Sequence, residues 1–244
     1  MIPIRDENRS RTEPYITRIL LIVNIIVFFV AFLPEFSSGN WLSALLGLSE
    51  STSLDKAILT YGMFPYEVLQ GQRLYTLFTS MFLHADLWHL GGNMLYLYIF
   101  GDNVEDTFGH GRYAFFYLLA GIVASAAHIM ILLYSVEELG LVGSWALYVP
   151  AIGASGAISG VLGAYLVLYP RARILTLVVI GWFFILPIPA VFFLGFWFIY
   201  QLLYGMLALE VPVGVAYWAH IGGFLAGSFF GLIWRGRRKR ALAL

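Results

Sequence analysis

Residues 113–134 read YAFFYLLAGIVASAAHIMILLY, an apolar run long enough to cross a lipid bilayer as a helix. A second run of the same character extends from Ala190 to Leu207. The chain of 244 residues is 60% hydrophobic and 11% charged, whereas a soluble domain carries roughly 25% charged residues. Such a chain cannot cover itself with a water-compatible surface. The sequence therefore predicts an integral membrane protein built as one bundle.

The polar breaks between the apolar runs predict six spans. They cover about 18–34, 88–104, 113–134, 153–169, 188–208 and 216–234. A seventh run, 174–187, is short and ends in Leu-Pro-Ile-Pro, so we interpret it as an interfacial or re-entrant piece. We therefore expect an all-α, six-helix membrane bundle. It would occupy residues 18–234, between a tail at 1–17 and a basic tail at 235–244.

The positions of the basic residues orient these spans. With six spans, both termini lie on one side together with twelve of the 14 Lys and Arg residues. The other side holds only Lys56 and Arg73. Because positively charged segments stay in the cytoplasm, we expect both termini to be cytoplasmic. The basic cluster at 235–240 is interpreted as an anchor on anionic lipid, so lipids are expected partners and nucleic acid is not.

The connection at 34–87 lies on the outer side in this arrangement. Its middle part, 63–82, mixes aromatic and polar residues, a composition typical of segments that lie in the plane of the membrane interface. We therefore expect a first loop that is embedded in the membrane and does not cross it.

Ser155 and His220 are polar residues within the expected spans, where such groups are costly and indicate function. Ser155 precedes Arg171 by 16 residues, and His220 precedes Arg235 by 15. At 1.5 Å per residue these spacings are ~24 Å and ~22 Å. Both spans run in the same direction, so both groups lie at one depth, below the outer surface. They could meet as a nucleophile and its general base.

Small residues surround both candidates. Gly153 and Gly156 would let a substrate approach Ser155 closely, and the free N–H groups of the first helical turn would face an oxyanion. The alternative is that the small residues only pack two helices together. The glycines available for such packing are Gly156, Gly160 and Gly163 on the fourth span and Gly222, Gly223 and Gly227 on the sixth. Spacing alone leaves both interpretations open.

A third polar group lies at the start of the second span. His89 and Asn93 are four residues apart, so both project from one helix face and can donate hydrogen bonds to an oxyanion. Alternatively, they tie the first loop to the bundle. His84 precedes the helix and is interpreted as a hydrogen bonder that fixes the loop. No carboxylate lies at this depth, which favours a Ser–His dyad over a triad.

Four motifs follow one another in the chain. They are His84-x4-His89-x3-Asn93, Gly101-x3-Glu105-x3-Gly109-x2-Arg112, Gly153-Ala154-Ser155-Gly156 and Ala219-His220-x-Gly222. Their order, over residues 60 to 235, resembles the rhomboid family of intramembrane serine proteases. The resemblance implies that Ser155 is the nucleophile, that His220 is the base, and that His89, Asn93 and the Ser155 amide form the oxyanion hole. It also implies a serine endopeptidase that needs no metal or organic cofactor and cleaves single-pass transmembrane proteins.

The resemblance has further implications and two departures. It implies structural roles for Glu105 and Arg112, a substrate gate made of the fifth helix and its cap at 209–215, and a multi-pass protein of a prokaryotic cell membrane. The family often has Trp-Arg in the first loop, where this chain has Gln72-Arg73. Many members also place a histidine-stacking tyrosine where this chain has Ser159. Another group must therefore orient His220, or it is held less firmly.

Three alternatives compete with this hypothesis. One is a catalytically inactive relative that binds or escorts membrane proteins; such relatives usually lose the serine or the histidine. Another is a metal site built from His84, His89 and His220, which lacks carboxylate ligands and an HExxH signature. Cysteine is absent, so thiolate ligands and disulfides are excluded. A transporter is the third, and it would usually need a charge at mid-membrane depth.

Overall fold

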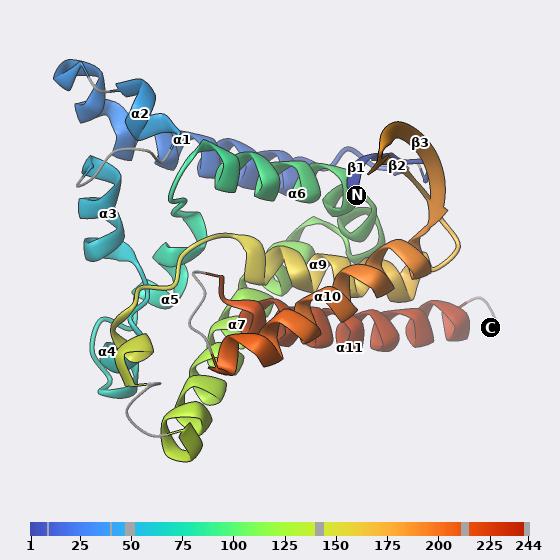
Figure 1. The fold of residues 1–244 in the computed structure, drawn as a ribbon. Coiled ribbons are helices and arrows are strands. Elements are labelled where there is room, and N and C mark those ends of the chain that lie inside the picture. The colour runs from blue at the N-terminus through green and yellow to red at the C-terminus, as the bar shows by residue number, and fades with distance from the viewer. Residues whose placement is uncertain (9, 40, 47–51, 140–143, 211–214, 242–244) are drawn as a thin grey trace.

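The fold is a bundle of long helices with a small sheet at one end. The computed structural model describes residues 1–8, 10–39, 41–46, 52–139, 144–210 and 215–241. The long helices are α1 (Tyr15–Ser38), α6 (Leu87–Phe108), α7 (His110–Leu139), α9 (Ser155–Leu168), α10 (Ala190–Glu210) and α11 (Tyr217–Ala241). Helices α6, α9 and α11 run in one direction, and α1, α7 and α10 run in the opposite one (Figure 1). Each expected span thus falls on one long helix.

Within the described residues, three helices are long and apolar enough to cross a membrane. These segments are Tyr15–Glu35, His110–Glu138 and Ala190–Ala208. Helix α9 has 14 residues, which at 1.5 Å per residue is about 21 Å and falls short of a ~30 Å hydrocarbon core. The chain is therefore a helical, multi-pass membrane protein, and the count of six spans stays a prediction.

Helix α9 forms the centre of the bundle, with every residue from Gly156 to Tyr165 buried. Helix α11 approaches it so closely that the two backbones touch. A Cβ atom added at Gly227 would lie 1.8 Å from the carbonyl oxygen of Gly160, and one added at Gly223 would lie 2.1 Å from that of Gly156. The glycine packing face expected between the fourth and sixth spans is therefore confirmed.

A small three-stranded antiparallel sheet, which the sequence did not predict, is added to the helical bundle. Its strands are β1 (Ile2–Asp6), β2 (Arg173–Ile180) and β3 (Trp182–Pro189), in the order β1-β2-β3. The run 174–187, interpreted as an interfacial or re-entrant piece, is thus a β-hairpin that turns at Gly181, whose φ is +68°. Its β-branched residues favour a strand, but its apolar character looked like membrane embedding. The segment 1–17, expected to be a tail, contains β1 and so completes this sheet.

The other end of the bundle carries the first connection. It folds into short helices: α2 (Trp41–Leu45), α3 (Ser53–Tyr61), α4 (Pro65–Leu69), α5 (Thr76–Thr79) and the 3-10 turn η1 (Ser80–Phe82). A second 3-10 turn, η2 (Trp145–Tyr148), precedes α9. These elements lie at the end of the bundle opposite to the sheet (Figure 1).

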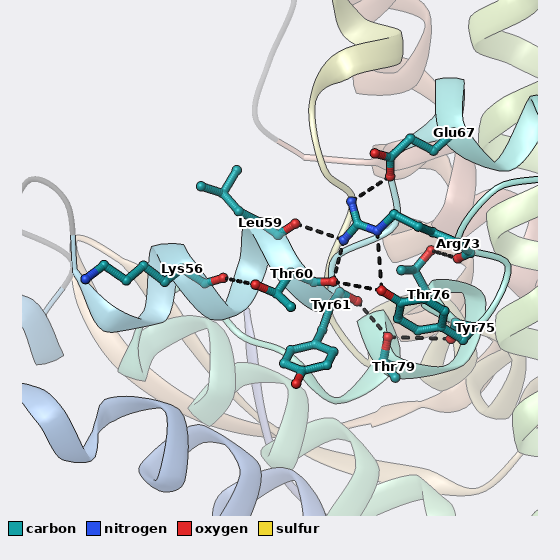
Figure 2. A network of polar contacts seen from close by, with 9 residues as sticks. All are labelled: Lys56, Leu59, Thr60, Tyr61, Glu67, Arg73, Tyr75, Thr76 and Thr79. Carbon is teal, nitrogen blue, oxygen red and sulfur yellow. Dashed lines mark hydrogen bonds and ion pairs between the residues drawn. The ribbon is translucent and has the colours of Figure 1, made fainter.

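Arg73 organises this connection, as Figure 2 shows. Its guanidinium donates to the carbonyl oxygens of Leu59, at 2.9 Å, and of Thr60, and it pairs with Glu67 at 2.7 Å. The carbonyl groups at the C-terminal end of α3 lack helical partners, so Arg73 caps that helix. The backbone of Arg73 has a φ of +47°, a conformation uncommon for a residue with a side chain. Although Gln72-Arg73 replaces the Trp-Arg pair common in the family, Arg73 therefore makes the contacts that hold the first connection together.

At the sheet end, Glu105 holds the start of α1. Its buried carboxylate accepts hydrogen bonds from the backbone N–H groups of Ile16 and Thr17, both at 2.8 Å, and from the Thr17 hydroxyl at 2.7 Å. A helix N-terminus has unpaired N–H groups, and a carboxylate satisfies them. Arg112 lies over the ring of Trp234 at 5.2 Å. These contacts agree with the structural roles expected for Glu105 and Arg112.

Candidate active site

Ser155 and His220 meet in the structure. The Nε2 atom of His220 lies 2.8 Å from the Oγ atom of Ser155, although 65 positions separate them in the chain. Ser155 is the first residue of α9, and His220 lies in the first turn of α11. The glycine contacts between these two helices fix the separation of the two side chains. Serine and imidazole within hydrogen-bond distance are the arrangement that activates a serine nucleophile.

The other ring nitrogen of His220 is held by α10. The Nδ1 atom lies 2.8 Å from Oε1 of Gln201, whose side chain is buried. The ring of Trp197 lies beside the imidazole at 6.1 Å between centroids, and that of Tyr217 lies edge-on at 6.4 Å. Both ring nitrogens are thus engaged, so the alternative metal site of His84, His89 and His220 would have to displace one of these contacts.

His89 faces Ser155 across Gly153. A Cβ atom added at Gly153 would lie 2.8 Å from Nε2 of His89 and 3.6 Å from Oγ of Ser155. The backbone of Gly153 has a φ of +115°, which L side chains rarely adopt. The N–H of Ala85 points at Nδ1 of His89 at 3.4 Å, which makes that nitrogen the acceptor. In the neutral ring Nε2 then carries the proton and can donate it into the site.

Asn93 lies one turn after His89 and is buried. Its amide nitrogen donates to the carbonyl oxygen of His89 at 3.0 Å, which uses one of its two N–H bonds. The backbone N–H groups at the start of α9, those of Ser155 and Gly156, belong to the helical turn that has no internal acceptors. The three donors expected for the oxyanion are therefore available on two helix starts, those of α6 and α9.

The first connection supports the segment before Ser155. Met63 and Ala151 exchange backbone hydrogen bonds at 3.1 and 2.8 Å, and the N–H of Gly153 donates to the carbonyl oxygen of Ser80 at 2.9 Å. A cavity of about 40 Å³ beside Ser155 is lined in part by Ser80, Ser125 and His128. A cavity of this size with several polar groups in its lining has room for a water molecule.

His84 differs from its expected role. It was interpreted as a hydrogen bonder that fixes the loop, but within the described residues neither ring nitrogen has a partner in hydrogen-bond geometry. Its buried ring packs edge-on against that of His89, with centroids 5.0 Å apart. Gly156 and Gly222 pack against α7, because Cβ atoms added there would lie 2.7 Å from Ala124 and 2.3 Å from Ala127. These three residues thus shape the site by packing.

Sequence reasoning missed Gln201 and Trp197. Both lie on α10. A single glutamine in an apolar run is equally consistent with ordinary helix packing, so the sequence did not indicate a contact with His220. Ser159, at the position of the histidine-stacking tyrosine, instead donates to the carbonyl oxygen of Ser155 at 2.6 Å. The group that the sequence required for orienting His220 therefore comes from another helix. Residues 211–214 of the expected gate cap lie outside the described residues.

Comparison with known proteins matches residues 71–237 to the Rhomboid domain. The chain is 33% identical over 156 residues to Rhomboid protein 1, mitochondrial, of Saccharomyces cerevisiae, covering 62% of this chain and 39% of that protein. It is 32% identical over 171 residues to RHOMBOID-like protein 6, mitochondrial, of Arabidopsis thaliana, covering 68% and 46%.

A bacterial relative extends the match along the chain. Rhomboid protease GluP of Bacillus subtilis is 26% identical over 234 residues, covering 93% of this chain and 38% of that protein. The chain spans less than half the length of each of these three relatives. Two of the three carry the word mitochondrial in their names, so the comparisons do not single out a prokaryotic membrane. The extent of the domain match shows that the chain belongs to the rhomboid family.

Proposed function

We propose that this protein is an intramembrane serine endopeptidase that uses a Ser155–His220 dyad. The observation that carries the proposal is the 2.8 Å contact between His220 Nε2 and Ser155 Oγ, with His220 Nδ1 held by a second hydrogen bond. A histidine held at both nitrogens is fixed in the orientation that accepts the serine proton. Simple helix packing does not require such an arrangement.

The reaction follows from these positions. Ser155 Oγ attacks the carbonyl carbon of the scissile peptide bond while His220 Nε2 takes the hydroxyl proton. The oxyanion receives hydrogen bonds from His89 Nε2, the free N–H of Asn93 and the backbone N–H of Ser155. His220 then returns the proton to the leaving amine, and a water molecule, for which the neighbouring cavity has room, hydrolyses the acyl-enzyme.

The proposed substrates are single-pass transmembrane proteins. A peptide bond within a helix has its carbonyl group hydrogen-bonded and shielded by side chains, so the segment must partly unwind before Ser155 can attack. Small and helix-destabilising residues near the cut make this unwinding less costly. The basic residues near both ends of the chain support an orientation with cytoplasmic termini, so the dyad would open toward the outer face.

The test is cleavage by the purified protein reconstituted in liposomes with a labelled transmembrane substrate. Wild-type protein is expected to cleave, and Ser155→Ala and His220→Ala are expected to be inactive. A fluorophosphonate is expected to label the wild type and not Ser155→Ala. Cleavage that survives Ser155→Ala would refute the dyad. A folded wild type that neither cleaves nor reacts would support the binding or escort role instead.

A further inference from the structure

His220 can act as the base only in one of its two neutral forms. The Nε2 atom must carry the lone pair that accepts the serine proton, so the ring proton must reside on Nδ1. In the other form Nε2 would itself donate to Ser155 and could not accept. Serine proteases with a triad use a carboxylate to hold the productive form. The dyad of this chain needs another acceptor facing Nδ1.

Gln201 supplies that acceptor from α10. Its Oε1 atom lies 2.8 Å from Nδ1 of His220, and its side chain is only 6% exposed. An amide oxygen accepts and cannot donate, so it stabilises the proton on Nδ1.

A second residue of α10 fixes the plane of the ring. Trp197, one helical turn before Gln201, lies beside the imidazole with an interplanar angle of 36°. Ser159 of α9 turns away and bonds to its own helix through the carbonyl oxygen of Ser155. Besides the contact with Ser155 itself, the side chains that hold the base therefore come from α10 and not from Ser159 of α9.

We propose that Gln201 is a positioning residue that holds His220 in the form with the proton on Nδ1, and that it thereby makes the dyad depend on the position of α10. The proposal rests on the dyad function given above. Helix α10 contacts α11 again where Trp218 Nε1 donates to the carbonyl oxygen of Gly205 at 2.9 Å. Displacement of α10 would separate Gln201 from His220 and leave the base unoriented.

The first experiment compares Gln201→Leu with Gln201→Glu in the liposome cleavage assay. Leucine keeps the approximate volume and removes the acceptor, so kcat is expected to fall about ten- to a hundredfold with little change in KM. Glutamate keeps an acceptor, so kcat is expected to recover. Its charge also favours the imidazolium, so the acid limb of the pH–rate profile should move to higher pH. A merely structural role would change thermal stability and leave that limb in place.

Leu203→Ala is the matched control. Leu203 lies on α10 two residues after Gln201, and its side chain is 56% exposed, so it faces away from the dyad. Its kcat and pH profile are expected to equal those of the wild type. A Gln201→Leu protein with wild-type kcat and an unshifted profile would overturn the proposal.

The second experiment reads the ring proton directly and needs no activity. With ¹⁵N-labelled histidine, the nitrogen shifts of His220, assigned by comparison with His220→Gln, are expected to show the proton on Nδ1 in Ser155→Ala. They are expected to show a mixture of forms when Gln201→Leu is added. A proton on Nε2 in Ser155→Ala would overturn the proposal, because the glutamine amide would then be donating. If the wild type lacks activity while the proton lies on Nδ1, the dyad function fails and the positioning by Gln201 stands.

Discussion

Helices α6 and α9 each carry polar residues at both ends, and the two ends are built differently. The dyad cluster comprises Ser155, His220, His89, Asn93 and Gln201. The sheet-end cluster comprises Glu105, Thr17, His110, Asp6, Asn103 and Tyr165. In the sheet-end cluster, Glu105 accepts four hydrogen bonds, including one from His110 at 2.6 Å, and Asp6 accepts from Asn103 and Tyr165 at 2.8 and 2.7 Å. Its charged groups are saturated with donors.

The dyad cluster is neutral and keeps donors in reserve. His89 Nε2 and the first N–H groups of α9 lie close to Ser155, and one N–H of Asn93 is not used by its bond to the carbonyl oxygen of His89. An unused donor in an apolar environment costs stability. Such donors are worth that cost where a reaction develops negative charge. We therefore expect the sheet end to serve stability and the dyad end to serve the proposed reaction, and variants at the two ends should separate these properties.

The largest expected effect is the loss of turnover on removing an oxyanion donor. His89→Ala and Asn93→Ala are each expected to lower kcat by about 10²–10³, as for other oxyanion-hole donors, with thermal stability nearly unchanged. The check is kcat in liposomes alongside the unfolding temperature. Equal losses of activity and stability in these variants would show that His89 and Asn93 only tie the first loop to the bundle.

At the sheet end, Glu105→Ala is expected to have the opposite effect, a loss of stability with little loss of activity. It leaves several buried donors of α1 unpaired, at about 1–3 kcal/mol for each buried group, so the unfolding temperature should fall by several degrees. The activity of the protein that remains folded should change by less than about twofold, because the dyad donors are untouched. Asp106→Ala is the control: Asp106 accepts from Thr12 at an exposed position, so its removal should cost less. A selective loss of kcat in Glu105→Ala would break the assignment.

Helix α10 is the expected substrate gate, and a disulfide can test whether it must move. The native chain has no cysteine, and a Cβ atom at Gly205 would lie 3.4 Å from that of Tyr217, close to the separation that a disulfide requires. In Gly205→Cys/Tyr217→Cys, oxidation is expected to block cleavage of a transmembrane substrate at least tenfold, and a reductant should restore it. Labelling by a small fluorophosphonate should persist, since Gln201 stays in place. The single variants are the controls, and full cleavage with the disulfide closed would show that α10 need not move.

The smallest expected effect concerns Asp6. Burial raises the pKa of Asp6 from 3.8 to about 6, against the lowering effect of the Tyr165 hydroxyl. The folded protein then binds this proton more tightly than the unfolded chain, so the contribution of Asp6 to stability is full below about pH 4 and is lost as the pH rises through about 6. The opening free energy of the β1 amides, from hydrogen exchange, should be higher at pH 5 than at pH 7. Asp6→Asn should abolish that difference, and an unchanged difference would assign it to another group.

Local rules made much of the architecture predictable. Apolar run length located the ends of each long helix to within seven residues, because a backbone buried in lipid must form a helix that satisfies its own hydrogen bonds. The spacing of Ser155 and His220 from the basic residues gave their common depth because the rise of a helix is fixed. Gly223 and Gly227 predicted the close contact with α9 because only small residues permit it.

The sheet escaped prediction because its causes lie far apart in the chain. Strand β1 pairs with β2 across more than 160 positions, as in the register of Ile2 with Leu177, and no local pattern encodes such a pairing. The apolar run that forms the hairpin is as consistent with a membrane segment as with a buried strand. The sequence also did not predict that Arg73, with a φ of +47°, caps α3. Its acceptors are backbone carbonyl groups, which every residue has, so no side-chain pattern indicates the contact.

By itself, the sequence determined which residues form the long helices, in which direction these helices run relative to one another, and which serine and histidine can reach the same level, because these depend on local composition and on a fixed helical rise. Only the tertiary structure decided that His89 Nε2 faces Gly153 and that Gln201 of α10 holds the second nitrogen of His220. Such contacts depend on how helices rotate about their axes and cross, and many side chains together set that packing.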